Sequence, residues 1–163
     1  MTGGVGSISI LLLSKLGYDV VAVSGKAATE ETYLKSLGAK EVVERSLFEG
    51  QAKPLGKETY SGCVDSCGGV VLANILPLIQ YGGVVAACGL ASGMGLVSTV
   101  APFILRGVAL AGVESALVPL DRRIQVYNRF GPLLTEEDLS LVTSNGCVVF
   151  LHHQSCTNCL CGR

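Results

Sequence analysis

Apolar and polar positions along the chain alternate between two periodicities from the start to about residue 130. Runs rich in valine, alanine and cysteine predict strands buried on both faces, because such strands need no polar side. These strands are expected at residues 19–25, 41–45, 62–68, 83–90 and 109–115. Helical spacing predicts helices between and beyond them, at residues 8–16, 29–38, 70–80, 97–106 and 119–130.

Residues that start, stop or break helices define several of these boundaries. Thr29 is expected to cap the second helix and Gly38 to end it. Pro77 should kink or shorten the third helix, and Pro119 should be the first residue of the last one. Residues 46–60 are expected to be an irregular, polar connection.

The alternation of strand and helix predicts an α/β fold with a doubly wound parallel sheet and right-handed crossovers. We expect one domain over residues 1–135. The alternation stops after about residue 139, so residues 136–163 are expected to be an irregular, non-native extension.

A glycine cluster opens the chain, T-G-G-V-G-S at residues 2–7, and an apolar run follows it at once. Glycines let backbone N–H groups approach a phosphate, and a helix N-terminus adds unpaired donors and partial positive charge. A glycine-rich start to a buried helix explains the cluster equally well when it is considered alone. In a dinucleotide-binding fold a strand precedes such a turn. Only Met1 precedes it here, so the sheet is expected to lack its first strand and to leave two neighbouring strands without ladder partners.

Charge and composition exclude several classes of partner. Acidic and basic residues nearly cancel, 13 against 12, so no basic surface for nucleic acid or an anionic membrane is expected. Residues 81–105 carry no charge and are long enough to span a bilayer. Glycines, serines and Pro102 divide this stretch into a strand, a loop and a helix, which predicts no membrane span.

The seven cysteines fall into two groups. Cys63, Cys67 and Cys88 lie in apolar runs and are expected to be core thiols of a reduced, cytoplasmic protein. The tail contains a second group with two histidines, and C-x-x-C spacing could ligate zinc. It offers only one such pair and no predicted scaffold for the others, so we predict no metal site. The tail residues concerned are Cys147, His152, His153, Cys156, Cys159 and Cys161.

The residues that follow the first predicted strand point to a phosphorylated ribose. A dinucleotide fold binds its adenosine ribose there, and a carboxylate would repel a 2′-phosphate. This chain has Ser24, Gly25 and Lys26 instead, which can donate to a phosphate. Such charge-assisted bonds favour NADPH over NADH by roughly ten- to a hundredfold. Arg45 could lie beside the adenine or the same phosphate; alternatively, Lys26 and Arg45 are ordinary surface residues.

Several motifs together resemble one known subgroup. They are T-G-G-V-G-S at 2–7, L-S-K-L-G-Y-D-V-V-A-V-S-G-K at 13–26, Y-L-K-S-L-G-A at 33–39, Y-G-G-V-V-A-A-C-G-L-A-S-G at 81–93, P-F-I-L-R-G-V at 102–108 and G-V-E-S at 112–115. The chain resembles, over residues 1 to about 130, the zinc-independent quinone oxidoreductases of the medium-chain dehydrogenase/reductase superfamily, in particular the NADPH-dependent acryloyl-CoA reductase type. The resemblance implies a Rossmann-like domain.

The resemblance also implies a function and a set of contacts. The expected reaction is NADPH-dependent reduction of an activated carbon–carbon double bond, in an enoyl thioester or a quinone-like acceptor. Plain core packing is the alternative for Leu90 and Ile104, and Asp65 is expected to be a buried, hydrogen-bonded carboxylate rather than a catalytic acid. The implied cofactor contacts are Thr2, Gly3, Gly4 and Val5 at the pyrophosphate, Ser24, Gly25 and Lys26 at the 2′-phosphate, Arg45 at the adenosine, Leu90 at the nicotinamide ribose, and Ile104 and Ser115 near the nicotinamide.

The chain departs from the full-length family pattern, which carries a catalytic domain ahead of the cofactor domain. We therefore expect the isolated chain to be catalytically incomplete. A non-catalytic NADPH-binding or scaffold module is the alternative. The small-molecule acceptor is not defined by these residues. A homodimer is an open alternative, because subunits of this family usually pair through the sixth strand.

Overall fold

The structure is a computed structural model that describes residues 3–143. Thr2 and the cysteine- and histidine-containing tail therefore lie outside the described residues. The elements of the first half are α1 (Gly4–Lys15), β1 (Val20–Ser24), α2 (Ala27–Ser36) and β2 (Ala39–Glu44). Those of the second half are η1 (Arg45–Phe48), β3 (Tyr60–Asp65), α3 (Gly69–Ile75), η2 (Leu76–Leu78), β4 (Ile79–Ala87), α4 (Ala101–Arg106), β5 (Ala109–Gly112), α5 (Leu120–Phe130), η3 (Gly131–Leu133) and α6 (Glu136–Val142).

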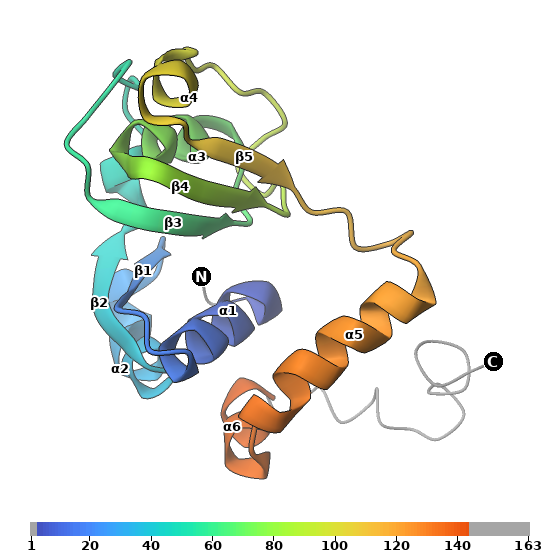
Figure 1. Ribbon diagram of the computed structural model, residues 1–163. Helices are drawn as coiled ribbons and strands as arrows, with labels where there is room; N and C mark the ends of the chain where they lie inside the picture. Colours follow the sequence, from blue (N-terminus) through green and yellow to red (C-terminus); the bar gives the residue numbers. More distant parts are fainter. Residues whose placement is uncertain (1–2, 144–163) are drawn as a thin grey trace.

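The strands form two parallel sheets, as Figure 1 shows. β1 pairs with β2, and β3, β4 and β5 pair in that order, every pair being parallel. The prediction of an α/β fold with parallel sheets is thereby confirmed. Among residues 3–143 no backbone ladder joins β1 to β3, as expected for a sheet that lacks the strand between them.

Each sheet has its own apolar core. Ile10 of α1 and Leu34 and Leu37 of the α2 region cover the first sheet and are almost fully buried. The core of the second sheet comprises Phe48, Val71, Leu72, Ile75, Leu76, Ile79, Val85 and Val108. Val23 of β1 and Val43 of β2 also pack against this second core, so side chains connect the two sheets where backbone bonds do not.

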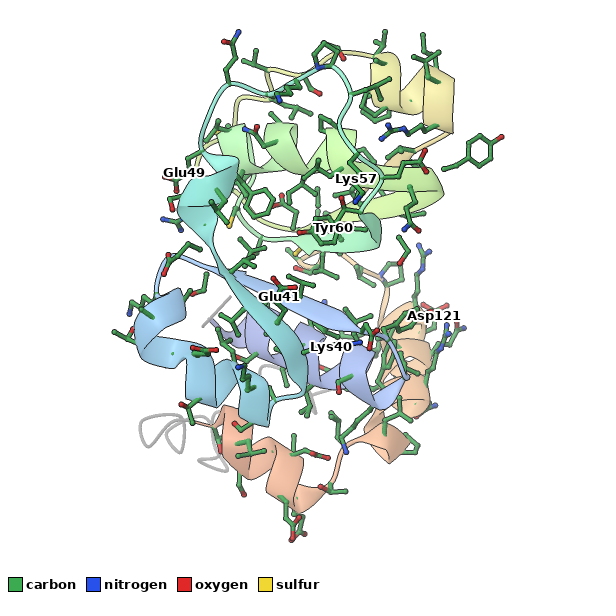
Figure 2. All side chains as sticks on the ribbon, turned by 90° about the vertical axis from the view of Figure 1, so that its left-hand side faces the viewer. Lys40, Glu41, Glu49, Lys57, Tyr60 and Asp121 are labelled. Carbon is green, nitrogen blue, oxygen red and sulfur yellow. The ribbon has the colours of Figure 1, made fainter. Side chains whose placement is uncertain are left out.

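Tyr60 and Glu41 lie where the two sheets approach each other, on β3 and β2 (Figure 2). Burial raises the pKa of the Tyr60 hydroxyl, and the nearby negative charge of Glu41 raises it further. The phenol is therefore neutral at ordinary pH.

Several predicted helix boundaries are wrong for identifiable reasons. α1 begins at Gly4, so the glycine turn is shorter than predicted. α2 begins at Ala27, and the Thr29 hydroxyl donates to the Lys26 carbonyl rather than capping the helix. Pro77 does shorten α3, and the chain enters β4 at Ile79. The expected helix over residues 97–106 forms only from Ala101.

The last two helices also differ from expectation. α5 is amphipathic as predicted, but none of its residues is buried, and Pro119 is its N-cap rather than its first residue. Glu136–Val142, expected to be irregular, forms α6 because Thr135 and Asp138 make a reciprocal capping box. Asp138 also pairs with Lys15 of α1 at 2.7 Å, and this bond holds the pKa of Asp138 down at about 2. The domain boundary at residue 135 stays a prediction.

The helices of residues 3–143 give no support to a membrane span. No helix there combines the length and the apolarity that crossing a bilayer requires. The uncharged stretch at residues 81–105 forms most of β4, a loop and most of α4.

We expect Arg106→Met to destabilise the fold by roughly 3 kcal/mol, because partly buried carbonyl acceptors lose a charged donor. The Arg106 guanidinium donates to the carbonyls of Pro77 at 2.8 Å and Gly56 at 2.6 Å, and it lies 3.5 Å from a Glu58 carboxylate oxygen. Urea denaturation should show a lower midpoint with an unchanged slope. The exposed Arg122→Met serves as the control, and equal midpoints for the two variants would contradict the prediction.

Candidate functional site

The turn after β1 presents a short polar segment at the end of the first sheet. Ser24 is only 2% exposed, and its hydroxyl oxygen accepts the Lys26 N–H at 3.1 Å. Gly25 and Lys26 are exposed. The buried serine therefore shapes the turn, while the lysine ammonium is free to reach a ligand.

Arg45 lies directly against this turn. The parallel register of β1 and β2 pairs Ser24 with Glu44, which brings Arg45 alongside Gly25. A Cβ atom added at Gly25 would lie 3.2 Å from the Arg45 Cζ and Nη2 atoms. Glycine thus leaves room for the guanidinium, and Ser24, Gly25, Lys26 and Arg45 form one group, called here the Arg45 cluster.

Two carboxylates border the Arg45 cluster. Glu49 accepts from the Arg45 Nε at 3.0 Å, an exposed pair one helical turn apart. Glu44 accepts the Ala28 N–H at 3.3 Å at the N-terminus of α2. The spacing of Arg45 and Glu49 could have signalled their pairing, whereas the Glu44 contact spans 16 residues and has no local signal.

The N-terminus of α1 is open, as a phosphate-binding helix end requires. Gly3 is the N-cap, and a Cβ atom at Gly3 or Gly4 would have nothing within 4 Å. Val5 is 56% exposed. A short turn reverses the chain between α1 and β1, so this helix end lies toward the same end of the sheet as Ser24. A bond of 3.1 Å from the Tyr33 hydroxyl to the Ser7 hydroxyl ties α2 to this end of α1.

Asp65 ends β3 as the buried, hydrogen-bonded carboxylate that was predicted, with 4% exposure. Its Oδ1 accepts the Cys67 N–H at 3.1 Å, and its Oδ2 accepts the Gly68 N–H at 2.9 Å. The turn that it holds carries Gly68 and Gly69 with φ of +66° and +55°. Left-handed backbone of this kind suits glycine.

The remaining predicted residues are divided between the two ends of the second sheet. Leu90 is 60% exposed in the loop after β4, and Ser115 is exposed after β5. Ile104 is 73% exposed on α4, so core packing is wrong for both Leu90 and Ile104. Two residues after Ile104, Arg106 binds carbonyls near the start of β4. Ile104 therefore lies apart from the carboxyl ends of the strands.

The three described cysteines are free thiols. Cys63 and Cys67 pack against the second core as expected, and Cys88 donates to the Asp65 carbonyl at 3.2 Å. Burial raises the pKa of Cys63 from 9.0 to about 12, with smaller contributions from Asp65 and the other two thiols. Within residues 3–143 no three histidine, cysteine or acidic side chains are arranged to hold a metal ion.

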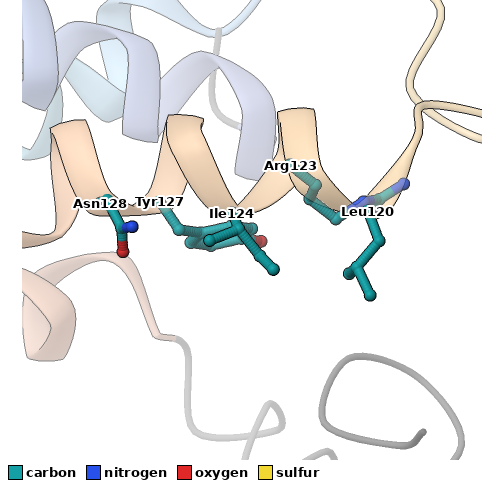
Figure 3. Close-up of a pocket in the computed structure, with 5 residues that line it drawn as sticks. All are labelled: Leu120, Arg123, Ile124, Tyr127 and Asn128. Atoms are coloured by element: carbon teal, nitrogen blue, oxygen red, sulfur yellow. The ribbon is translucent and has the colours of Figure 1, made fainter.

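A shallow groove also runs along α5. Its lining comprises Leu120, Arg123, Ile124, Tyr127 and Asn128, which Figure 3 shows along the helix. None of these residues was among the predicted contacts.

Comparison with known proteins identifies the family. A family model described as zinc-binding dehydrogenase matches residues 4–120, which include both sheets. The chain belongs to this family. The resemblance to the quinone oxidoreductase and acryloyl-CoA reductase subgroup of the medium-chain superfamily is confirmed by its relatives.

Two curated relatives illustrate the similarity. An Escherichia coli (strain K12) protein, AcuI, named as an acrylyl-CoA reductase, is 53% identical over 128 residues, which are 78% of this chain and 39% of that protein. A Bacillus subtilis (strain 168) protein, YhfP, named as a quinone oxidoreductase, is 47% identical over 139 residues, 85% of this chain and 42% of that protein. The chain thus spans about two fifths of the length of these relatives.

Solved structures share the fold. The YhdH oxidoreductase of Salmonella enterica in complex with NADP superimposes with a TM-score of 0.82 at 46% identity, covering 86% of this chain and 43% of that one. Bacillus subtilis YhfP with NAD bound gives 0.79 at 41% identity, covering 94% and 49%. The prediction of a Rossmann-like fold is confirmed by these matches.

We expect Cys63 to react slowly with iodoacetamide in the folded chain. The thiolate is the nucleophile, and a pKa of about 12 rather than 9.0 lowers its fraction at pH 8 by about three orders of magnitude. Peptide mass spectrometry after timed alkylation measures the rate at this site. The same chain unfolded in guanidinium is the control, and equal rates in the two states would contradict the prediction.

Proposed function

We propose that the chain is the cofactor-binding domain of an NADPH-dependent oxidoreductase that reduces an activated carbon–carbon double bond. The acceptor is an acryloyl-CoA-type enoyl thioester or a quinone-like compound. The observation that carries the proposal is the Arg45 cluster, in which a guanidinium lies against Gly25 and the next residue of the same turn is the exposed Lys26. The names of the AcuI and YhfP relatives support the reaction class.

The Arg45 cluster suits the adenosine end of NADPH. Lys26 would place a positive charge near a 2′-phosphate, and the exposed Gly25 N–H would add a neutral donor. The flat guanidinium of Arg45 can stack on an adenine or bind a phosphate oxygen. The NADP bound in the Salmonella enterica YhdH structure supports this choice, whereas the YhfP structure holds NAD.

The remaining contacts follow the order of the dinucleotide. The open end of α1, with Gly3, Gly4 and Val5, would receive the pyrophosphate. Leu90 and Ser115, which follow β4 and β5, would border the nicotinamide half. Ile104 has the least support, because it lies toward the other ends of these strands.

When bound, NADPH supplies hydride to the β-carbon of the acceptor. The described residues would bind and orient the dinucleotide, and none of them is proposed as a catalytic acid. Asp65 has both carboxylate oxygens engaged by backbone N–H groups, which suits a structural role. We propose that groups polarising the acceptor carbonyl belong to parts of the relatives that this chain does not span.

Lys26→Ala tests the cofactor assignment. We expect the dissociation constant for NADPH to rise roughly ten- to a hundredfold, because a charge-assisted bond to the 2′-phosphate is lost. NADH affinity should hardly change. Calorimetric titration of both cofactors against the 163-residue chain provides the measurement.

The matched control for this test is Lys40→Ala. Lys40 is exposed and pairs with Asp19, away from the Arg45 cluster. Equal losses for NADPH and NADH in Lys26→Ala, or no loss at all, would remove Lys26 from the site. An unfolded Lys26→Ala chain would be detected by its circular dichroism.

We further expect the isolated chain to bind NADPH without reducing acryloyl-CoA or a quinone at a measurable rate. Binding would depend on the residues described above, whereas turnover also needs an acceptor site. Stopped-flow absorbance of NADPH at saturating cofactor measures the reaction. Sustained NADPH oxidation that depends on the chain would contradict the proposal that the chain is catalytically incomplete. Tight NADPH binding without turnover is also the result expected of a non-catalytic NADPH-binding module.

A further inference from the structure

We propose that Asp65 is a positioning residue that fixes the loop at residues 88–93 for the nicotinamide half of the cofactor. This inference rests on the proposed function. Asp65 touches no predicted cofactor contact itself. It acts through a turn of backbone that packs against the loop carrying Leu90.

The first step is the shape of the turn. Asp65 uses both carboxylate oxygens on successive backbone donors, Cys67 and Gly68, and it is 4% exposed. Hydrogen bonds to a charged acceptor are stronger than those between neutral groups. They hold Gly68 and Gly69 in left-handed conformations at the start of α3.

The second step is the contact between this turn and the loop. The Ser92 N–H donates to the Cys67 carbonyl at 2.6 Å, and the Ala91 N–H donates to the Ser66 carbonyl at 3.3 Å. A parallel bridge pairs Gly68 with Gly93. These bonds attach the loop to Ser66, Cys67 and Gly68, and the last two of these residues donate to the Asp65 carboxylate.

The third step is how closely the two backbones approach. A Cβ atom at Gly89 would lie 2.4 Å from the Ser66 carbonyl oxygen. One at Gly68 would lie 2.7 Å from the Gly93 carbonyl oxygen. Such distances leave no space for a side chain, so the loop position depends on the exact path of the turn.

The fourth step is what the loop presents. Asp65 also holds the beginning of the loop through its own carbonyl, which accepts the Cys88 N–H at 2.8 Å. Leu90 lies between the two attachments with a side chain that is 60% exposed. Backbone bonds rather than side-chain burial therefore keep this leucine at the surface, where the nicotinamide ribose is proposed to lie.

Asp65→Asn tests the inference with little change in volume. One carboxylate oxygen becomes an NH₂ group that faces a backbone N–H, so one bond of the turn is lost. We expect the dissociation constant for NADPH to rise about tenfold, with that for adenosine 2′,5′-bisphosphate changing less than twofold. The bisphosphate carries only the adenosine half, which would bind at the Arg45 cluster on the other sheet.

Two further variants make the comparison decisive. Asp121→Asn removes an exposed carboxylate on α5 and should leave both affinities unchanged. Gly89→Ala keeps the Asp65 carboxylate but pushes the loop from the turn, and it should reproduce the selective loss of NADPH affinity. If Asp65→Asn fails to fold, Gly89→Ala decides the question by the same criterion.

A spectroscopic readout separates positioning from general stability. The fluorescence of bound NADPH reports the surroundings of the nicotinamide, and its change on binding should be smaller in Asp65→Asn at saturating protein. Equal losses for the two ligands, or unchanged NADPH affinity, would overturn the inference. If the wild-type chain binds the bisphosphate as tightly as NADPH, the inference about Asp65 fails while the proposed function stands. If the wild-type chain binds neither NADPH nor the bisphosphate, the proposed function fails as well.

Discussion

The lack of a backbone ladder between β1 and β3, within residues 3–143, determines how the rest of the structure is held together. Hydrogen-bond ladders fix register inside each sheet, but burial of apolar side chains has no direction and fixes only proximity. Val23 and Val43 provide that proximity by packing against the core of the second sheet. The two sheets therefore each have a precise internal geometry, and side-chain packing relates one to the other.

This division also separates the candidate site into two parts. The Arg45 cluster depends on the register of β1 and β2, which sets Ser24 opposite Glu44. The Asp65 turn depends on the pairing of β3 and β4, which sets Asp65 opposite Ala87 and the loop beyond it. Each half of a dinucleotide would thus meet a part of the chain that is assembled by its own sheet, so binding of the adenosine half does not require a correctly placed nicotinamide half.

Features encoded by neighbouring residues could be predicted from the sequence, and features that depend on distant partners could not. The predicted strands lie within a few residues of the observed ones because their apolar runs are continuous. Ser24, Gly25 and Lys26 were identified because they stand at the end of one such run. The start of α2 was missed because Glu44, 16 residues beyond Ala28, accepts its N–H. The capping box at Thr135 and Asp138 was a local signal that the apolar pattern did not reveal. The separation of Ile104 from Leu90 depends on Arg106 reaching back to Pro77, which no spacing encodes.

The carboxylates beside the Arg45 cluster bear on whether a phosphate can bind there at all. Exposed ion pairs such as Arg45–Glu49 contribute roughly 1 kcal/mol or less, because water screens them and ordering two long side chains costs entropy. A charge-assisted bond from a phosphate contributes about 1.5–3 kcal/mol. A phosphate oxygen can therefore displace Glu49 from Arg45 at little cost. Glu49 then serves to hold the guanidinium over Gly25 without preventing it from binding a ligand.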